Sequence, residues 1–259
     1  MIFVALAVGL ITGSFLNVCI YRLPEGKSVV FPGSHCRVCL KAIGWYDNIP
    51  LVSYAALRGR CRHCRASISP QYFWIEFFTG ALFLLFYFHF GLTARGVVYL
   101  VFSLALLVET AIDFRHQIIP DAITLPGMVL GLLISACLPG LHAQTSPLWG
   151  FVWALAGLLA GGGILYLAGT LAEWILKKEA LGGGDVKLLA MIGTIIGWPG
   201  VLWTIFVSSL LGSMVGLYVR FTKGEERIPY GPYLAAAAFS YLFIGPQAIK
   251  VYLKFIGVI

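Results

Sequence analysis

The chain has 259 residues, of which 59% are hydrophobic and only 11% are charged, whereas ordinary soluble domains carry roughly 25% charged residues. This composition excludes a water-soluble globular enzyme and predicts a protein that lies mostly in a membrane. The 30 glycines suit helices whose backbones pack closely inside a bilayer. The formal net charge is +7, from 18 Lys and Arg against 11 Asp and Glu, so the positions of the basic residues are informative.

The N-terminal segment is apolar, and residues 1–20 contain no basic side chain. The basic n-region of an export signal is therefore missing. The segment continues directly into Tyr21-Arg22-Leu23-Pro24 and offers no small-x-small cleavage site. We expect residues 1–21 to form a retained transmembrane helix.

Further apolar runs match the length that a bilayer core of about 30 Å requires. Together they predict an all-α polytopic membrane protein with about eight transmembrane helices, near residues 2–20, 72–90, 97–113, 122–138, 148–172, 186–198, 200–219 and 233–249. The run 186–198 would rise only roughly 20 Å. It is a short or re-entrant helix, or it tilts into the next run through Trp198-Pro199-Gly200.

Eight spans place alternate loops on opposite sides, and the basic residues divide unequally between these sides. One side collects Arg22, Lys27, Arg37, Lys41, Arg58, Arg60, Arg62, Arg65, Arg115, Lys177, Lys178, Lys187, Arg220, Lys223 and Arg227. The other side collects only Arg95, Lys250 and Lys254. By the positive-inside rule the first side is cytoplasmic, and the N-terminus faces outward.

One loop is large enough to fold by itself. Residues 22–71 hold four of the six cysteines together with turn-forming Pro and Gly, and they predict a small cytoplasmic domain between the first two spans. The remaining residues, 72–259, form the transmembrane domain in this division.

The cysteines of the loop form two C-x2-C pairs, Cys36 with Cys39 and Cys61 with Cys64, separated by 21 residues. Two such pairs complete a closed four-cysteine zinc site, which is structural because no coordination position is left for a substrate. A loop of this size has too small a core to fold unaided, so a metal would hold it together. Disulfides seldom persist in the reducing cytosol; redox-active dithiols and simple reduced thiols remain the alternatives.

The other two cysteines, Cys19 and Cys137, fall within predicted membrane helices. We expect them to be packing residues.

Acidic side chains inside spans are costly unless they are paired or reached by water. Asp113 lies at the cytoplasmic end of the third predicted span, with Glu109 one turn deeper on the same face. Asp185 follows three glycines at the start of the sixth span. Two nearby carboxyl groups that share one proton are the equipment of an aspartic protease. The alternative is that these acids mark the membrane boundary or pair separately with Arg115 and Lys187.

At this point the sequence resembles the bacterial type IV prepilin peptidases, which are bifunctional leader peptidase/N-methyltransferases. The matching pieces run almost end to end: Gly13-Ser14-Phe15-Leu16-Asn17-Val18, Tyr21-Arg22-Leu23-Pro24, the four cysteines with Trp45-Tyr46-Asp47-Asn48-Ile49-Pro50 and Leu57-Arg58-Gly59-Arg60-Cys61 between them, Ile112-Asp113, Ile119-Pro120-Asp121, Gly182-Gly183-Gly184-Asp185-Val186-Lys187 and Ile228-Pro229-Tyr230-Gly231-Pro232. A G-x-G-D motif alone is weak, but motifs in family order are specific.

The resemblance places the family's catalytic aspartates on Asp113 and Asp185 and its metal-binding cysteines on Cys36, Cys39, Cys61 and Cys64. It implies cleavage of a basic leader from prepilins and type II secretion pseudopilins at the cytoplasmic face. It further implies N-methylation of the new N-terminus with S-adenosylmethionine. The first C-x2-C of the family usually carries Pro where this chain has Arg37, which leaves the ligands unchanged.

The expected location is the bacterial inner membrane, with multiple passes and with the lipid bilayer and the pilin substrates as partners; we expect no nucleic-acid partner. The methyltransferase half rests on the resemblance alone, because no Rossmann glycine fingerprint follows a strand. The residues that bind S-adenosylmethionine therefore stay unassigned.

Five further acids have simpler explanations than catalysis. Glu76 and Asp47 are candidates for a part in methyl transfer, but we expect them to form helix-start salt bridges with arginines. Asp121 is expected to act as an N-terminal cap or first-turn acid. Glu225 and Glu226 would attract a basic leader, or they belong to an ordinary solvated loop.

Two other functions compete with this interpretation. A presenilin-like intramembrane protease also uses G-x-G-D, but it has Tyr-Asp where this chain has Ile112-Asp113. A transporter would use its acids to carry protons or ions, but it would need no cytoplasmic zinc domain.

Overall fold

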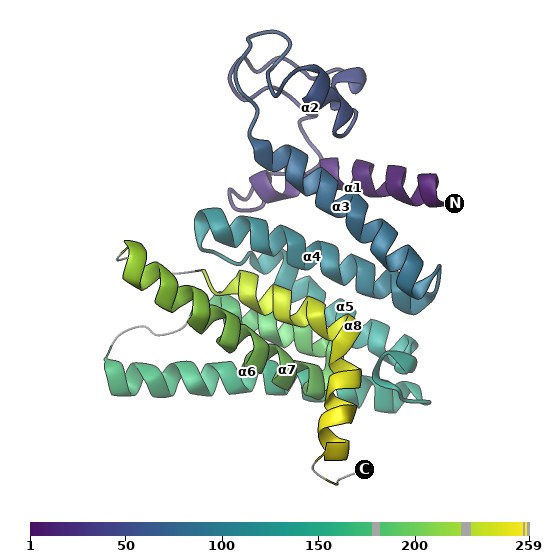
Figure 1. The fold of residues 1–259 in the computed structure, drawn as a ribbon, viewed down its shortest axis with the longest axis vertical. Helices are drawn as coiled ribbons and strands as arrows, with labels where there is room; N and C mark the ends of the chain where they lie inside the picture. The colour runs from purple at the N-terminus through teal and green to yellow at the C-terminus, as the bar shows by residue number, and fades with distance from the viewer. Residues whose placement is uncertain (178–181, 224–228, 256, 258–259) are drawn as a thin grey trace. The chain divides into compact units, whose positions relative to one another are not determined.

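The computed structural model describes residues 1–177, 182–223, 229–255 and 257, and within these ranges it contains helices and turns but no β-strand (Figure 1). This confirms the all-helical prediction. The chain divides into two compact units, Met1–Leu104 and Ala105–Ile259. The longer elements are α1 (Ile2–Arg22), α3 (Pro70–Phe90), α4 (Ala94–His116), α5 (Asp121–Cys137), α6 (Pro147–Leu176), α7 (Gly183–Lys223) and α8 (Gly231–Phe255).

The first unit is built on the packing of α1 against α3. A Cβ on Gly13 would lie 2.7 Å from the Cα of Glu76, and one on Gly9 would lie 3.0 Å from the Cα of Gly80. Glycine therefore lets the two helix backbones approach closely, as in membrane helix pairs. The interface also buries Asn17, whose side-chain amide donates to the Tyr72 carbonyl at 3.1 Å.

Between α1 and α3 lies the cysteine-bearing loop with two short helices, η1 (Trp45–Asn48) and α2 (Val52–Ala56). The α3 helix begins with favourable capping chemistry. Pro70 occupies the first turn, and the Ser69 hydroxyl accepts a hydrogen bond from the Gln71 N–H at 3.3 Å. The Ser69 cap and Pro70 therefore fix the start of α3 directly after the cysteine-bearing loop.

The second unit packs α6 against α7, and α7 against both α5 and α8. A Cβ on Gly193 would lie 3.0 Å from the backbone nitrogen of Leu158, and one on Gly161 would lie 3.1 Å from that of Ala190. Close glycine-mediated packing thus recurs between α6 and α7. Ser146 caps α6 by accepting from the Trp149 N–H at 3.3 Å.

Two of the long helices are interrupted. Gly197 has φ 70° and ψ 176°, which breaks helical geometry inside α7. In α8 the segments Gly231–Phe243 and Gly245–Phe255 meet at 74°, a bend that Figure 1 shows clearly. Pro246 follows that break, and proline removes a helical N–H and clashes with the preceding turn.

Within the described residues, five helices are long and apolar enough to cross a membrane, or six if the bent α8 is one span. The α5 helix, with 17 residues, falls just below that length. The predicted runs 186–198 and 200–219 lie in the single α7, with the break at Gly197. The protein is therefore an integral membrane protein by the length and composition of its helices.

Candidate functional sites

The first cysteine pair folds into a tight turn. The N–H of Cys36 donates to the Lys41 carbonyl, and the N–H of Leu40 donates to the Cys36 carbonyl, both at 2.9 Å. Leu40 adopts a left-handed φ of 58°. His35 and Ala42 form an antiparallel bridge that closes the base of the turn.

The second pair repeats this turn 25 residues later. The N–H of Cys61 donates to the Ala66 carbonyl at 2.9 Å, and the N–H of Arg65 donates to the Cys61 carbonyl at 3.0 Å. Arg65 has a φ of 60°, and Arg60 and Ser67 form the matching bridge. In the sequence this internal repeat is visible only as the shared Cys-Arg-x-Cys at the start of each turn.

The two turns bring the four cysteines together, as predicted. The ligand atoms of Cys36, Cys39, Cys61 and Cys64 all lie within 4.8 Å of one another, and the Sγ atoms of Cys36 and Cys64 are 3.7 Å apart. Tetrahedral zinc with bonds of about 2.3 Å would hold its sulfurs about 3.8 Å apart. All four are free thiols rather than disulfides, so the donor set fits a zinc ion.

The thiol of Cys36 is prepared for metal binding. The backbone N–H groups of Cys39 and Val38 lower the pKa of Cys36 to about 6. Its thiolate, which is the form that binds metal, is therefore present at neutral pH.

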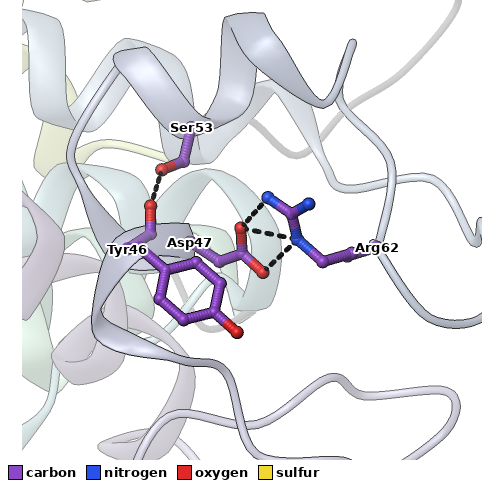
Figure 2. A network of polar contacts seen from close by, with 4 residues as sticks. All are labelled: Tyr46, Asp47, Ser53 and Arg62. Atoms are coloured by element: carbon purple, nitrogen blue, oxygen red, sulfur yellow. Dashed lines mark hydrogen bonds and ion pairs between the residues drawn. The ribbon is translucent and has the colours of Figure 1, made fainter.

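An ion pair attaches the second turn to η1 (Figure 2). Arg62 Nε lies 3.0 and 2.8 Å from the two carboxyl oxygens of Asp47, and Arg62 Nη2 lies 2.6 Å from Oδ1. The hydrogen bonds from Arg62 lower the pKa of Asp47. The Ser53 hydroxyl donates to the Tyr46 carbonyl at 2.9 Å and so ties η1 to α2. The predicted salt bridge of Asp47 is confirmed.

In the first turn, Arg37 occupies the position that Arg62 has in the second turn, directly after the first cysteine. The guanidinium carbon of Arg37 lies 3.0 Å from the ring centroid of Tyr21, within the usual range of a cation–π contact. Tyr21 in turn stacks on Tyr72 of α3, with centroids 5.4 Å apart. Each turn is thus held to its surroundings by the residue after its first cysteine.

Glu76 does not form the predicted salt bridge. Its Oε2 accepts a hydrogen bond from the Leu51 N–H at 2.8 Å, and the residue is buried in α3. Leu51 has a φ of 59°, so this carboxylate satisfies the N–H of a residue in an unusual conformation. A backbone donor takes the place of the expected arginine.

The two cysteines predicted to be packing residues, Cys19 and Cys137, differ in burial. Cys19 is buried in α1, as expected, whereas Cys137 is exposed. Cys137 is the last residue of α5, where the helix end has left the packed interior.

In the second unit Asp113 is buried near the C-terminal end of α4. Its Oδ2 accepts a hydrogen bond from the Gly231 N–H at 3.0 Å. Gly231 begins α8, so the positive end of that helix faces the carboxyl group. A Cβ on Gly231 would lie 2.7 Å from Oδ2, so the close approach depends on glycine.

Asp185 occupies the first turn of α7 and interacts electrostatically with Asp113. Ile119 lies between the helix starts: a Cβ on Gly184 would be 3.0 Å from its Cβ, and one on Gly231 would be 3.3 Å from its Cδ1. The structure therefore brings together the two aspartates that the sequence analysis selected, although they are 72 residues apart.

Lys187 does not pair with Asp185. Its ammonium group lies 2.7 and 2.8 Å from the two carboxyl oxygens of Asp121. Asp121 is in the first turn of α5, as predicted, and the N-cap position itself is Pro120, which makes no side-chain capping hydrogen bond. This ion pair joins α5 to α7 and leaves Asp185 facing Asp113.

Glu109 lies one turn deeper in α4 than Asp113 and is only 1% exposed. It interacts electrostatically with Asp113, and within the described residues neither of its carboxyl oxygens has a hydrogen-bond partner. The predictions that fall on Lys178, Glu225, Glu226, Arg227 and Ile228 lie outside the described residues.

Comparison with known proteins finds two family models along the chain. The model of the bacterial Peptidase A24 N-terminal domain matches residues 7–90, which include the cysteine turns. The model of the type IV leader peptidase family matches residues 100–217, which include both aspartates. No solved structure matches the chain significantly.

Curated relatives match nearly the whole chain. A protein of Stutzerimonas stutzeri is 38% identical, and the match covers 97% of this chain and 93% of that protein. A protein of Pseudomonas aeruginosa is 37% identical, and the match covers 96% of this chain and 92% of that protein. A protein of Klebsiella pneumoniae is 41% identical, and the match covers 78% of this chain and 87% of that protein. Each of the three is named prepilin leader peptidase/N-methyltransferase.

Proposed function

We propose that this chain, which belongs to the type IV leader peptidase family, cleaves the basic leader peptide from type IV prepilins and type II secretion pseudopilins. The observation that carries the proposal is the proximity of Asp113 and Asp185: Ile119 lies beside both Gly184 and Gly231, Gly231 donates to Asp113, and the two carboxyl groups interact electrostatically. The names of relatives that share nearly the full length of the chain support the substrate class.

In the proposed mechanism the two carboxyl groups act as a pair. Two interacting carboxyls cannot both ionise cheaply, so one keeps a proton while the other is charged. The charged member takes a proton from a water molecule as that water attacks the peptide carbonyl. The protonated member donates its proton to the carbonyl oxygen, and the carboxyl group that took the proton from water then gives it to the leaving amine. The first carboxyl regains a proton from a hydroxyl of the tetrahedral intermediate as the peptide bond breaks. No covalent intermediate forms.

Asparagine at either position tests the pair. Asp113→Asn and Asp185→Asn should each abolish cleavage, because each removes a proton-transfer group with little change of shape. The measurement is cleavage of a synthetic leader-bearing pilin by purified protein, analysed by mass spectrometry, beside Asp121→Asn as a control. Asp121 is an aspartate of the same unit whose partner is Lys187, and its variant should still cleave. Substantial cleavage by folded Asp113→Asn or Asp185→Asn would remove the pair from the mechanism.

We further propose that Cys36, Cys39, Cys61 and Cys64 hold one structural zinc ion, which when bound fixes the two turns to each other. Elemental analysis should find about one zinc per chain. Replacing Cys36 and Cys39 with Ser should release it, whereas Cys137→Ser, which removes an exposed cysteine elsewhere, should not. Metal-free wild-type protein that keeps a folded loop would contradict this site.

Methylation of the new N-terminus is the second activity in the proposal. S-adenosylmethionine would supply the methyl group. Within the described residues there is no strand, so a Rossmann-type glycine turn is not available for it. Mass spectrometry with and without S-adenosylmethionine would report the added methyl group separately from cleavage. We expect cysteine substitutions to reduce methylation or substrate affinity more than peptide-bond cleavage, because the metal loop carries neither aspartate.

The proposed location is the bacterial inner membrane, with eight crossings, the N-terminus outside, and the zinc loop and aspartates on the cytoplasmic side. The length of α7 supports the crossing count. Its 41 residues would extend about 60 Å if straight, twice the bilayer core of about 30 Å. The divisions 1–21, 22–71 and 72–259 remain our proposal for the domains.

Contacts at the two ends of α7 also support a return across the membrane. Asp185 near its start interacts with Asp113, and Gly231 just beyond its end donates to Asp113. The eight residues from 223 to 231 reach at most about 28 Å. In our proposal the two ends of α7 therefore lie on the same side of the membrane, and the non-helical Gly197 is where α7 would reverse.

A further inference from the structure

The geometry points to Tyr230 as a positioning residue for the peptidase reaction: its phenol, held by Ser208 of α7, fixes the start of α8 so that the Gly231 N–H occupies one oxygen of Asp113. This inference rests on the proposed catalytic role of Asp113. It assigns a role to Tyr230 and Gly231, which belong to the motif at residues 228–232 and are not used in the cleavage mechanism above.

Hydrogen bonds join the Tyr230 hydroxyl to two serines of α7. The Ser208 hydroxyl donates to the Ile205 carbonyl at 3.2 Å, so its oxygen is free to accept from the Tyr230 hydroxyl at 2.8 Å. The Ser209 hydroxyl lies 3.4 Å from the same phenol oxygen. Ser208 is fully buried, so removing the phenol hydroxyl would leave a buried acceptor unsatisfied.

The same residue initiates α8. The Tyr230 carbonyl accepts from the N–H of Tyr233 at 3.1 Å and from that of Leu234 at 3.2 Å. Tyr230 is therefore held at two points, by its phenol to α7 and by its carbonyl to the first turn of α8. The next residue, Gly231, is consequently fixed in place, with its N–H directed at Asp113.

The Gly231 hydrogen bond orients the Asp113 carboxyl group. Oδ2 is occupied by the Gly231 N–H at 3.0 Å, and no hydrogen bond from the described residues occupies Oδ1. The carboxyl group is thus prevented from rotating, and Oδ1 is the oxygen available for proton transfer. A displacement of about 1 Å in such a group can reduce a rate about a hundredfold.

A second hydrogen bond between α7 and α8 offers a matched control. Trp203 Nε1 donates to the Ser240 hydroxyl at 3.0 Å, in the part of α8 beyond its first two turns. Losing this bond would weaken the same helix pair without touching Gly231. Tyr233 supplies a second control, because its replacement by Phe removes a phenol hydroxyl three residues from Tyr230.

The test compares cleavage kinetics of purified Tyr230→Phe, Ser208→Ala and their combination with those of Trp203→Phe and Tyr233→Phe. We expect kcat to fall about tenfold or more in the first two, with KM within about threefold, because alignment rather than substrate binding is lost. The double variant should be no slower than the slower single variant, because both remove one interaction. The two controls should keep a kcat within about threefold of wild type.

Several results would overturn the inference. One is a wild-type kcat in Tyr230→Phe or Ser208→Ala. Another is a loss of kcat in Trp203→Phe as large as that in Tyr230→Phe. A third is a double variant whose loss of kcat is the product of the losses in the two single variants. If Tyr230→Phe does not fold, as judged by thermal unfolding in detergent, Gly231→Ala decides. Its Cβ would press on Asp113 Oδ2, so a wild-type kcat there contradicts the inference.

The outcome for Asp113 separates this inference from the proposed function. If Asp113→Asn still cleaves, the catalytic role of Asp113 fails, and the positioning of its carboxyl has no consequence for cleavage. If Asp113→Asn is inactive while Tyr230→Phe is unaffected, the peptidase proposal stands and only the positioning role fails.

Discussion

At the scale of single residues, Glu109 is the acid that the proposed mechanism does not use, although it interacts with Asp113. A charge on this carboxyl would be buried and without a hydrogen-bond partner among the described residues, which costs several kcal/mol. Glutamine has the same shape and carries no charge. We therefore expect Glu109→Gln to keep kcat/KM within about threefold, since an uncharged group already fits there.

Cleavage kinetics and the thermal midpoint in detergent check this expectation, with Asp113→Asn measured in parallel as the inactive reference. A tenfold or greater loss of kcat/KM in a stable Glu109→Gln enzyme would mean that three carboxyl groups, rather than two, take part in proton transfer.

The paired contacts of Arg62 give a second residue-scale prediction. Lysine keeps the charge but cannot form the bidentate contact that Arg62 makes with Asp47. We expect Arg62→Lys to release zinc to a chelator faster, by about tenfold, in the range seen when groups that orient metal ligands are removed. Arg37→Lys should release zinc more slowly than Arg62→Lys, because an ammonium group can still contact the Tyr21 ring. Equal release rates for Arg62→Lys and wild type would show that this ion pair does not support the metal site.

Sequence patterns predicted the cysteine site and the aspartate pair, but not every contact around them. Fixed spacing identified the cysteines, and costly acids inside apolar runs identified Asp113 and Asp185. By contrast, the partner of Lys187 depends on how α5 and α7 pack, and the contact of Ser208 with Tyr230 depends on how α7 packs against the start of α8. No local pattern encodes either contact.

At the scale of elements, apolar run length located the helices, but their interruptions were harder to place. The sequence suggested a boundary at Trp198-Pro199-Gly200, whereas the non-helical residue is Gly197. The 74° bend of α8 falls inside the predicted run 233–249. Proline is tolerated in membrane helices, where other groups can satisfy the freed carbonyl, so Pro246 alone did not predict a bend.

A buried polar cluster lies against the break in α7. Ser135 donates to the Thr194 carbonyl at 2.9 Å, and its oxygen lies 3.0 Å from Nε2 of His142. A Cβ on Gly197 would lie 3.1 Å from Nδ1 of that histidine. The cluster therefore holds the turn in place and limits which residue fits there.

Gly197→Ala should consequently destabilise the protein. The φ and ψ of Gly197 are almost confined to glycine, so alanine there costs about 1–3 kcal/mol, and its Cβ would also crowd His142. Gly163→Ala is the matched control, since a Cβ there meets no atom within 4 Å and alanine inside a helix gains about 0.5–1 kcal/mol. Thermal unfolding in detergent should show a lower midpoint for the first variant and an unchanged or higher midpoint for the second. A stable Gly197→Ala protein would contradict the importance of the break.

At the scale of the whole molecule, the chain order of the helices constrains where the proposed active site lies. Between Asp113 at the end of α4 and Asp185 at the start of α7, the described part of the chain contains two long helices, α5 and α6. If each crosses the membrane once, the two aspartates emerge on the same side, which agrees with their electrostatic contact. The loop between α5 and α6 would then face the opposite compartment, which is the exterior in the orientation that we propose from the positive-inside rule.

Single cysteines on the two loops test this orientation. In the sequence, Gln144 and Lys178 stand in these two loops, but the Gln144 side-chain amide donates to the His142 carbonyl, and Lys178 lies outside the described residues. Thr145 and Lys177 are exposed neighbours of these positions. We expect Thr145→Cys to react with a membrane-impermeant thiol reagent in intact spheroplasts, and Lys177→Cys to react only after lysis. The background would carry Cys137→Ser but keep the four metal-binding cysteines, whose own labelling is measured in the parent protein. The reverse pattern would invert the topology, and it would place both aspartates away from the compartment in which a basic leader resides.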